Sequence, residues 1–272
     1  MYVDSHVHYA HKRFNSVRNV LLPQLYQNGL EAAVEAAISA ESNLVMQEVL
    51  EPYPWMYYSV GLHPNCVEAG REKDIAYEQV IFEALKNPKV VAVGETGLDY
   101  HRLRYETDAD KLMAQALKRR QEYWFDKLIA LAQDRDLPLI IHTREAHGIT
   151  LCILQEWTLR KNPGVIHCFR GDTFIAKEYL NLGFYLGIGG ALTYDTEEET
   201  REAVKEIPLE RILLETDSPF LVPEGSTESK NTSANIPIVA KLIGELKGIS
   251  AREVMEVTAE NTRELFRIEK HN

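Results

Sequence analysis

The feature that most constrains the fold of this chain is a regular alternation of short apolar runs with longer segments of helical spacing. The runs are rich in aliphatic and β-branched residues, and they recur along most of the chain. Such an alternation is typical of parallel strands connected by helices. Eight runs carry the pattern, and they cover residues 2–8, 31–39, 56–63, 90–97, 137–143, 164–169, 184–190 and 211–217.

The segments between these runs place apolar residues three and four positions apart, as amphipathic helices do. The clearest of them are residues 76–87, 121–136 and 173–183. A final segment, 250–268, opens with Ser250 and has Glu253 three positions later, the capping-box pattern of a helix start. No low-complexity tract, linker or repeat divides the chain. We therefore predict an α/β fold with one domain over 1–272, a TIM-type barrel of eight parallel strands.

Composition narrows the class of protein. The chain has 272 residues, of which 45% are hydrophobic and 26% charged, as in ordinary globular proteins. Neither a signal peptide nor a membrane-spanning run of about 18 apolar residues is recognisable, so we expect a cytoplasmic protein that needs no membrane. The sequence implies no protein partner. Cys66, Cys152 and Cys168 form no CxxC pattern, which favours reduced thiols.

The net charge of −11 argues against a broad cationic surface for duplex nucleic acid. Local basic stretches occur at 101–105 and 117–120. Each is either a solvated loop or helix face, or part of a rim that guides a polyanion.

Six of the eight runs end in residues that bind metals in proteins. These residues are His6, His8, His63, Glu95, His142, His167 and Asp217. In a barrel of this type the carboxyl ends of the strands converge on one rim, where active sites lie. Residues far apart in the sequence would therefore meet there.

Each residue also has a simpler interpretation when it is taken alone. A histidine after a strand is usually a hydrogen-bonded structural residue, Glu95 fits a buried ion pair, and Asp217 before Ser218 and Pro219 fits a turn or helix cap. Burying the whole set at one end of a barrel without a shared cation would leave many polar groups to satisfy in one place. We therefore predict six metal ligands: His6, His8, Glu95, His142, His167 and Asp217.

The ligand types indicate the ion and the chemistry. Alternation along the strand directs His6 and His8 into the barrel and Val7 outward. Imidazole and carboxylate favour zinc or another transition ion over calcium, and the absence of cysteine leaves hard divalent ions open, so the cofactor is one or two ions of Zn, Mg or Mn. Two ions fit if Glu95 bridges them. One would then be held by His6, His8, Glu95 and Asp217, and the other by His142, His167 and Glu95. A water activated between two such ions points to hydrolysis.

The strings DSHVH, GLHP, GETGLDY, LPLIIHTREA, IHCFRG and LLETDSPFL span the chain in this order. Together they resemble the TatD family of metal-dependent deoxyribonucleases within the amidohydrolase superfamily. The resemblance implies a TIM barrel with one or two divalent cations that hydrolyses phosphodiester bonds, with exonuclease character and DNA as the substrate. On the matching positions it implies the same six metal ligands, with Glu95 as the bridge and His63 beside the substrate phosphate.

Three regions depart from the family pattern. A long charged segment, 101–121, follows GETGLDY, and we expect substrate choice to differ at this loop after the fourth strand. Residues 226–237 offer Lys230, Asn231 and Asn235 but no arginine. Arg170 replaces a small polar residue, so that it either touches a phosphate or pairs with an acid at the rim.

The expected mechanism is attack of water on phosphorus. The predicted catalytic residues are Asp217 as the general base, Glu95 as the bridging acid and His63, with Arg144 or Arg170, as stabilisers of phosphoryl charge. Glu215 is either a partner of a ligand or a structural acid.

Two other functions use the same ligands. A metal-dependent amidohydrolase or small-molecule phosphoesterase would have a capped pocket, whereas a nuclease needs an open groove with groups such as Tyr100, Arg102, Arg104 and Tyr105. A metal-holding protein without turnover is the third possibility. The aromatic residues Trp55, Tyr57 and Tyr58 are expected to pack rather than to stack on bases.

Overall fold

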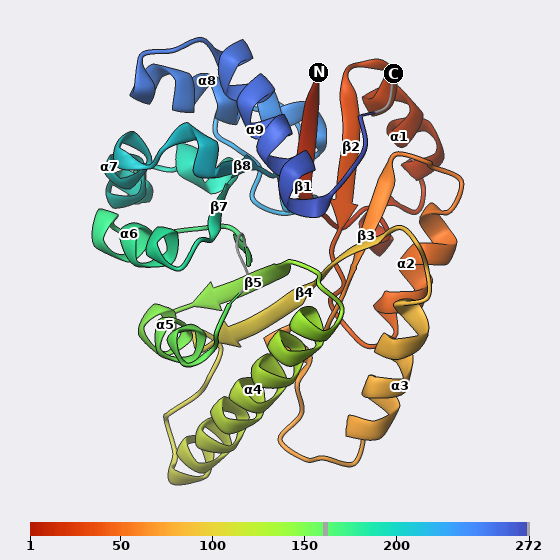
Figure 1. Ribbon diagram of the computed structural model, residues 1–272, viewed down its shortest axis with the longest axis vertical. Helices are drawn as coiled ribbons and strands as arrows, with labels where there is room; N and C mark the ends of the chain where they lie inside the picture. The colour runs from red at the N-terminus through yellow and green to blue at the C-terminus, as the bar shows by residue number, and fades with distance from the viewer. Residues whose placement is uncertain (160–162, 271–272) are drawn as a thin grey trace.

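The computed structural model describes residues 1–159 and 163–270, and its eight parallel strands form one sheet in chain order. The first and last strands also meet, because Val7 bridges Ser218 and the His6 carbonyl accepts the Asp217 N–H at 3.0 Å. The predicted TIM-type barrel is therefore confirmed (Figure 1). The strands are β1 (Tyr2–Val7), β2 (Leu30–Glu35), β3 (Met56–Val60), β4 (Val90–Asp99), β5 (Leu139–Arg144), β6 (Gly164–Ile166), β7 (Tyr185–Ile188) and β8 (Ile212–Leu214).

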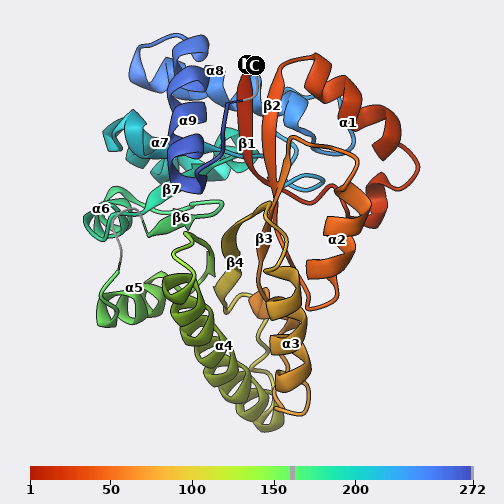
Figure 2. The same cartoon turned by 45° about the vertical axis from the view of Figure 1, so that its right-hand side comes forward.

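Helices lie around the outside of the strands, as Figures 1 and 2 show from two directions. They are α1 (Arg18–Gln27), α2 (Ser42–Leu50), α3 (Asp74–Ala84), α4 (Asp108–Asp134), α5 (His147–Glu156), α6 (Thr173–Asn181), α7 (Glu198–Glu206), α8 (Ile236–Lys247) and α9 (Ala251–Phe266). Within the described ranges no helix is long and apolar enough to cross a bilayer. The three cysteines are free thiols.

Two apolar clusters use opposite faces of the strands. Leu139 and Ile141 of β5 belong to the larger cluster, which includes helix residues. Ile140, between them, belongs to the smaller one with Val165 of β6 and Phe266 of α9. Consecutive strand residues point to opposite faces, so each strand contributes side chains to both clusters. Because apolar side chains dominate both clusters, the polar residues of a catalytic site are expected at the carboxyl ends of the strands.

The segment after β4 differs from the sequence prediction. A helix was expected only over 121–136, with a charged loop over 101–121, but α4 begins at Asp108. Thr107 Oγ1 accepts the Asp110 N–H at 3.1 Å, while Asp110 accepts the Thr107 N–H at 3.0 Å. This capping box, followed by strong helix formers, starts the helix earlier than its apolar stripe indicates. The loop is therefore much shorter than predicted.

The other predicted elements agree with the structure apart from their ends. The terminal helix predicted over 250–268 is α9, and Ser250 Oγ accepts the Glu253 N–H at 3.1 Å. Strands β6 and β8 end earlier than predicted, so that His167 and Asp217 lie in the segments just after them. This places both side chains at the barrel mouth.

Candidate metal centre

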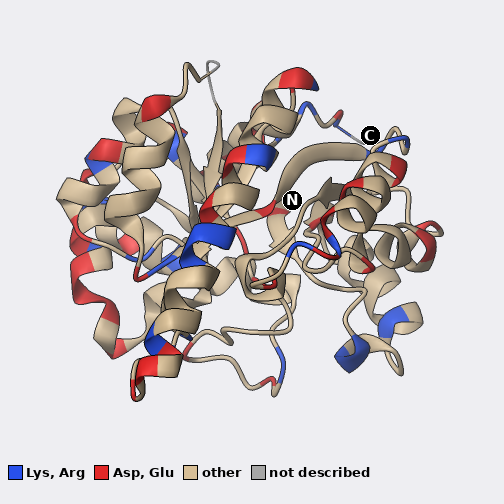
Figure 3. Ribbon diagram, turned by 90° about the horizontal axis from the view of Figure 1, so that it is seen from below, with Lys and Arg blue, Asp and Glu red and all other residues tan. Residues whose placement is uncertain are grey.

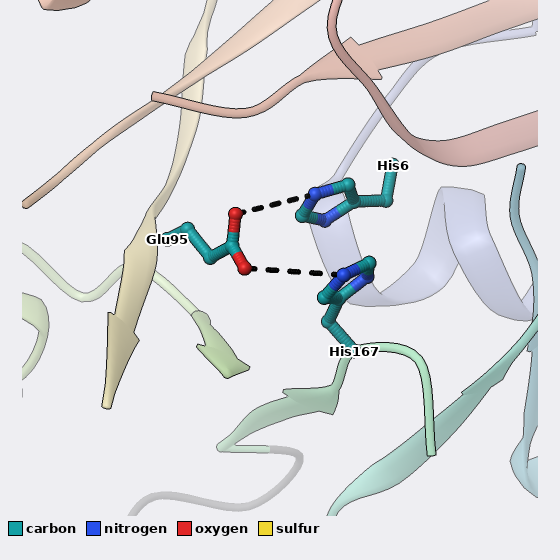
Figure 4. Close-up of side chains that lie close together, drawn as sticks. All are labelled: His6, Glu95 and His167. Atoms are coloured by element: carbon teal, nitrogen blue, oxygen red, sulfur yellow. Dashed lines mark ion pairs between the residues drawn. The ribbon is translucent and has the colours of Figure 1, made fainter. Parts of the chain in front are cut away.

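The predicted ligands, although they come from distant parts of the sequence, meet at the carboxyl ends of the strands. Figure 4 shows three of them, His6 from β1, Glu95 from β4 and His167 after β6. Glu95 Oε2 lies 3.5 Å from His6 Nε2, and Glu95 Oε1 lies 3.9 Å from His167 Nε2. All three side chains are buried. One carboxylate thus faces two imidazoles that stack on each other.

A first group of donors lies where β1 and β8 meet. His8 Nε2 is 3.1 Å from Asp217 Oδ1, and His6 Nε2 is 3.8 Å from the same oxygen. The two histidine Nε2 atoms are 3.2 Å apart. Val7, between the histidines, belongs to the larger apolar cluster, which includes helix residues. The β1–β8 group, His6, His8 and Asp217, therefore converges as the alternation along β1 predicts.

A second group lies on the β3, β4 and β5 side. His142 Nδ1 is 2.8 Å from Glu95 Oε1, and His63 Nε2 is 3.5 Å from the same oxygen. The sequence paired His142 with His167, but the His167 ring stacks on His6 with ring centroids 3.5 Å apart. His63 takes the place beside His142 in this β3–β5 group, with Glu95 between the two groups.

Glu95 is the electrostatic centre of the site. Burial alone would raise the pKa of its carboxyl group, but His63, His142 and His6 hold that pKa well below its usual range. The carboxyl group is therefore ionised. Its oxygens divide between the groups, with Oε2 toward His6 and Oε1 toward His63 and His142.

Three of these histidines, His8, His142 and His167, approach a carbonyl or carboxylate oxygen with the second ring nitrogen, whereas His6 Nδ1 has no hydrogen-bond partner in the described part of the chain. His8 Nδ1 is 3.1 Å from the Ala36 carbonyl, His142 Nε2 is 3.3 Å from Asp99 Oδ2, and His167 Nδ1 is 2.9 Å from Glu215 Oε1. Such contacts fix ring orientation and tautomer in metal sites. The Glu215 carboxylate lies beside Gly187, where a Cβ would come within 2.2 Å of its Oε2. Glycine in β7 thus leaves room for the partner of His167.

The donor set fits divalent cations. Although burial lowers a histidine pKa, the Asp217 carboxylate raises that of His8 to about 9 and Glu215 raises that of His167 to about 10. The site therefore attracts positive charge strongly. The facing Nε2 atoms of His6 and His8 cannot both be neutral acceptors without repulsion, and a shared cation removes that conflict.

Comparisons with known proteins agree with this arrangement. The model of the family described as TatD related DNase matches residues 3–267. The chain belongs to the TatD family of metal-dependent hydrolases. It is 33% identical to the metal-dependent hydrolase YabD of Bacillus subtilis, over 98% of this chain and 100% of that protein. The crystal structure of the TatD homolog YjjV from Escherichia coli superposes with a TM-score of 0.84 at 30% identity, covering 98% of each chain.

A third relative of this TatD chain is named 3'-5' ssDNA/RNA exonuclease TatD, from Klebsiella pneumoniae. It is 32% identical over 82% of this chain and 81% of its own length.

Sequence reasoning did not assign Asp99 to the site. Its Oδ2 contacts His142 and accepts a hydrogen bond from Asn65 Nδ2 at 2.7 Å, and its side chain is 2% exposed. Although burial opposes ionisation, His142 and Asn65 lower the pKa of this carboxyl group. A signal was available, because Asp99 follows Glu95 by an even number of residues on β4 and so shares its strand face.

Several residues at the rim of this TatD site are held by other contacts. Arg170 forms an ion pair with Glu197, as one of its two predicted roles requires. Asn231 Nδ2 donates to the Thr216 carbonyl at 2.7 Å, and Asn235 donates to Asn231 at 2.9 Å. Both asparagines are buried, so they shape the segment after β8 instead of facing a substrate.

The structure also shows the surroundings of some of the aromatic and basic residues singled out in the sequence. Trp55 stacks on Tyr26 with ring centroids 4.2 Å apart, and Tyr58 is buried, so their packing role is confirmed. Arg120 of the 117–120 stretch is buried against Asp74. Figure 3 shows that acidic and basic residues are interspersed along the helices.

Proposed function

We propose that this TatD chain hydrolyses phosphodiester bonds and degrades single-stranded DNA from an end. The observation that carries the proposal is the position of Glu95 between two donor groups, with one oxygen toward each. That arrangement suits a carboxylate shared by two cations, the design common in phosphodiester hydrolysis. The exonuclease name of the Klebsiella pneumoniae relative supports the choice of substrate.

We propose His6, His8 and Asp217 as the ligands of one cation, and His142 and His167 as ligands of the other, with Glu95 shared. His63 lies beside His142, which makes it the neighbour of the substrate phosphate in this proposal. When bound, the cations lower the pKa of a coordinated water and neutralise charge on a phosphoryl oxygen.

Asp217 is the proposed general base. Although burial opposes ionisation, His8 and His167 lower the pKa of its carboxyl group, so the group is a carboxylate that can accept a proton. Its Oδ1 already lies near His8 and His6. The attacking water gives its proton to the Asp217 carboxylate as its bond to phosphorus forms and the bond from phosphorus to the leaving nucleotide oxygen breaks; that oxygen takes up a proton from solvent.

His63 is the proposed contact to the phosphoryl group. Burial lowers the pKa of its imidazole to about 4, so the ring is neutral near pH 7. Its Nδ1 accepts the Asn65 N–H at 3.0 Å, which leaves the proton on Nε2, the nitrogen that faces the site. A neutral N–H donor at that position can bond to a phosphoryl oxygen.

A small-molecule phosphoesterase or amidohydrolase remains the second candidate. It is favoured by the net charge of −11, which opposes binding of a polyanion. The same donor groups would serve such a reaction.

The deciding experiment measures shortening of end-labelled single-stranded DNA after removal of metal with a chelator and separate restoration of Mg, Mn or Zn. A bis-aryl phosphodiester and an N-acyl amino acid are assayed in parallel. We expect metal-dependent shortening that falls by about 10²–10⁴-fold in Asp217→Asn. Turnover of the small ester or amide alone would contradict the nuclease proposal, and full activity of Asp217→Asn would remove that residue from its role.

A further inference from the structure

The rings of Phe220 and His11 form an aromatic corner at the mouth of the barrel, beside the β1–β8 group. The Phe220 ring lies 6.2 Å from the His8 ring and 5.6 Å from the His11 ring, measured between centroids. Phe220 remains 39% exposed. Its ring is therefore accessible to a group bound at the edge of the polar site.

Both rings are fixed to the predicted ligands through the backbone. The Phe220 N–H donates to the Asp217 carbonyl at 2.8 Å, and the His11 N–H donates to the His8 carbonyl at 3.1 Å. His11 Nδ1 also accepts the Arg13 N–H at 3.2 Å, which orients its ring. The corner is therefore rigid, and each ring lies three residues beyond a predicted ligand.

Three cations accompany the corner. Lys12 and Arg13 are exposed, and neither forms an ion pair with any carboxylate in the described part of the chain. Lys230 Nζ donates to the Arg13 carbonyl at 2.9 Å, which joins the segment after β8 to the segment after β1. The charges of Lys12 and Arg13 are therefore available to a bound anion.

We propose a nucleotide platform at this corner that binds the nucleotide next to the cleaved phosphodiester bond. The platform consists of His11, Lys12, Arg13, Phe220 and Lys230. A base stacks on the face of Phe220, while Lys12, Arg13 and Lys230 meet the adjacent phosphates. The inference rests on the proposed function and names the side of the mouth that takes the strand. A base can offer its face only when it is unpaired, so the platform selects single strands.

The test is a binding titration of fluorescein-labelled oligothymidylate by anisotropy on the Asp217→Asn background, with and without Phe220→Ala. We expect Phe220→Ala to raise Kd about tenfold, because the stacking of one base is removed. Phe220→Trp should restore the affinity. Phe82→Ala, which removes a more accessible ring (48% exposed) near the C-terminal end of α3, should leave Kd unchanged.

The cations are tested through salt dependence. The double variant Lys12→Ala, Arg13→Ala should make the slope of log Kd against log salt shallower by about 0.7 for each phosphate that the protein no longer neutralises. Lys241→Ala on α8, whose side chain is 75% exposed, is the matched control. An unchanged slope would overturn the pairing of these cations with phosphates.

Kinetics on the otherwise unmodified protein separate this platform from the proposed function. We expect Phe220→Ala to raise KM for DNA and to leave turnover of a bis-aryl phosphodiester and the metal content unchanged. Equal losses on both substrates would mean that Phe220 only supports the metal centre, which would overturn the platform. DNA shortening with the same KM in Phe220→Ala and Phe82→Ala would overturn the platform and leave the nuclease intact. Absence of both DNA binding and DNA shortening in the unmodified protein would overturn both proposals.

Discussion

The two sides of the barrel mouth use similar residues in different ways. On the β8–β1 side, Phe220 is partly exposed and Lys12 has no ionic partner among the described residues. On the β4–β5 side, the Tyr100 hydroxyl donates to Glu122 at 2.9 Å, and the Asp99 N–H donates to Gln121 at 3.0 Å. Both of these acceptors belong to α4. On the first side Phe220 and Lys12 are open to a substrate. On the second side Asp99 and Tyr100 are held by α4, although Tyr105 is also exposed.

The difference follows from the lengths of the neighbouring elements. Helix α4 has 27 residues and packs along β4, so it offers partners to the residues that leave that strand. The segment after β1 forms only a short 3-10 helix, Lys12–Phe14, before α1. Its cations therefore have few neighbours. The sequence suggested the region after β4 as the nucleic-acid groove. There Tyr100 is tied to α4 while Tyr105 remains 48% exposed, and our proposal places the strand after β1 because Phe220 lies against His8.

The largest expected effect is that of Glu95→Ala, because both sides of the mouth lose their shared carboxylate. We expect loss of bound metal and a fall in activity of more than about 10²-fold. This exceeds the effect of removing a residue that only hydrogen-bonds to a metal ligand. Metal content after dialysis, measured by mass spectrometry, checks this. Glu245→Ala, on the exposed face of α8, is the control. An unchanged metal stoichiometry would remove Glu95 from its role as the bridge.

Asp99→Asn tests the bracing role of the β4–β5 side. The substitution keeps the shape of the side chain but removes the charge that orients His142, so metal affinity should fall about 10–100-fold. Calorimetric titration of the chelator-treated protein with Zn or Mn measures it. Asp126→Asn is a matched control, because Asp126 accepts from Trp157 Nε1 far from the ligands. Affinities equal to those of the control would show that Asp99 does not act on the site.

Tyr100→Phe has the smallest expected effect, and it tests the difference between the two sides of the mouth most directly. Loss of the hydroxyl removes a hydrogen bond to Glu122, so the free energy of unfolding should fall by about 1 kcal/mol in urea denaturation. KM for DNA should change less than about twofold. A rise in KM as large as that of Phe220→Ala would move the substrate strand to the β4–β5 side.

The barrel and most of the site could be predicted because the signals are local to each strand end. His6 and His8 follow from period-two spacing, and Glu95, His142, His167 and Asp217 follow from their positions at or just after apolar runs. Parallel order then brings the carboxyl ends together. The start of α4 could not be read from apolar spacing, because its first turns are exposed and are fixed by the cap at Thr107.

The amino-acid sequence by itself determined the order of the strands, the class of hydrolase and the donor residues at the mouth, since each is recognisable from short stretches of sequence at the strand ends. Only the tertiary structure decided that His63 lies beside His142, that Asp99 backs His142, and that Phe220 lies against His8. Those contacts join segments that are distant in sequence. Their geometry depends on how the strands twist and how the helices pack, which no local pattern encodes.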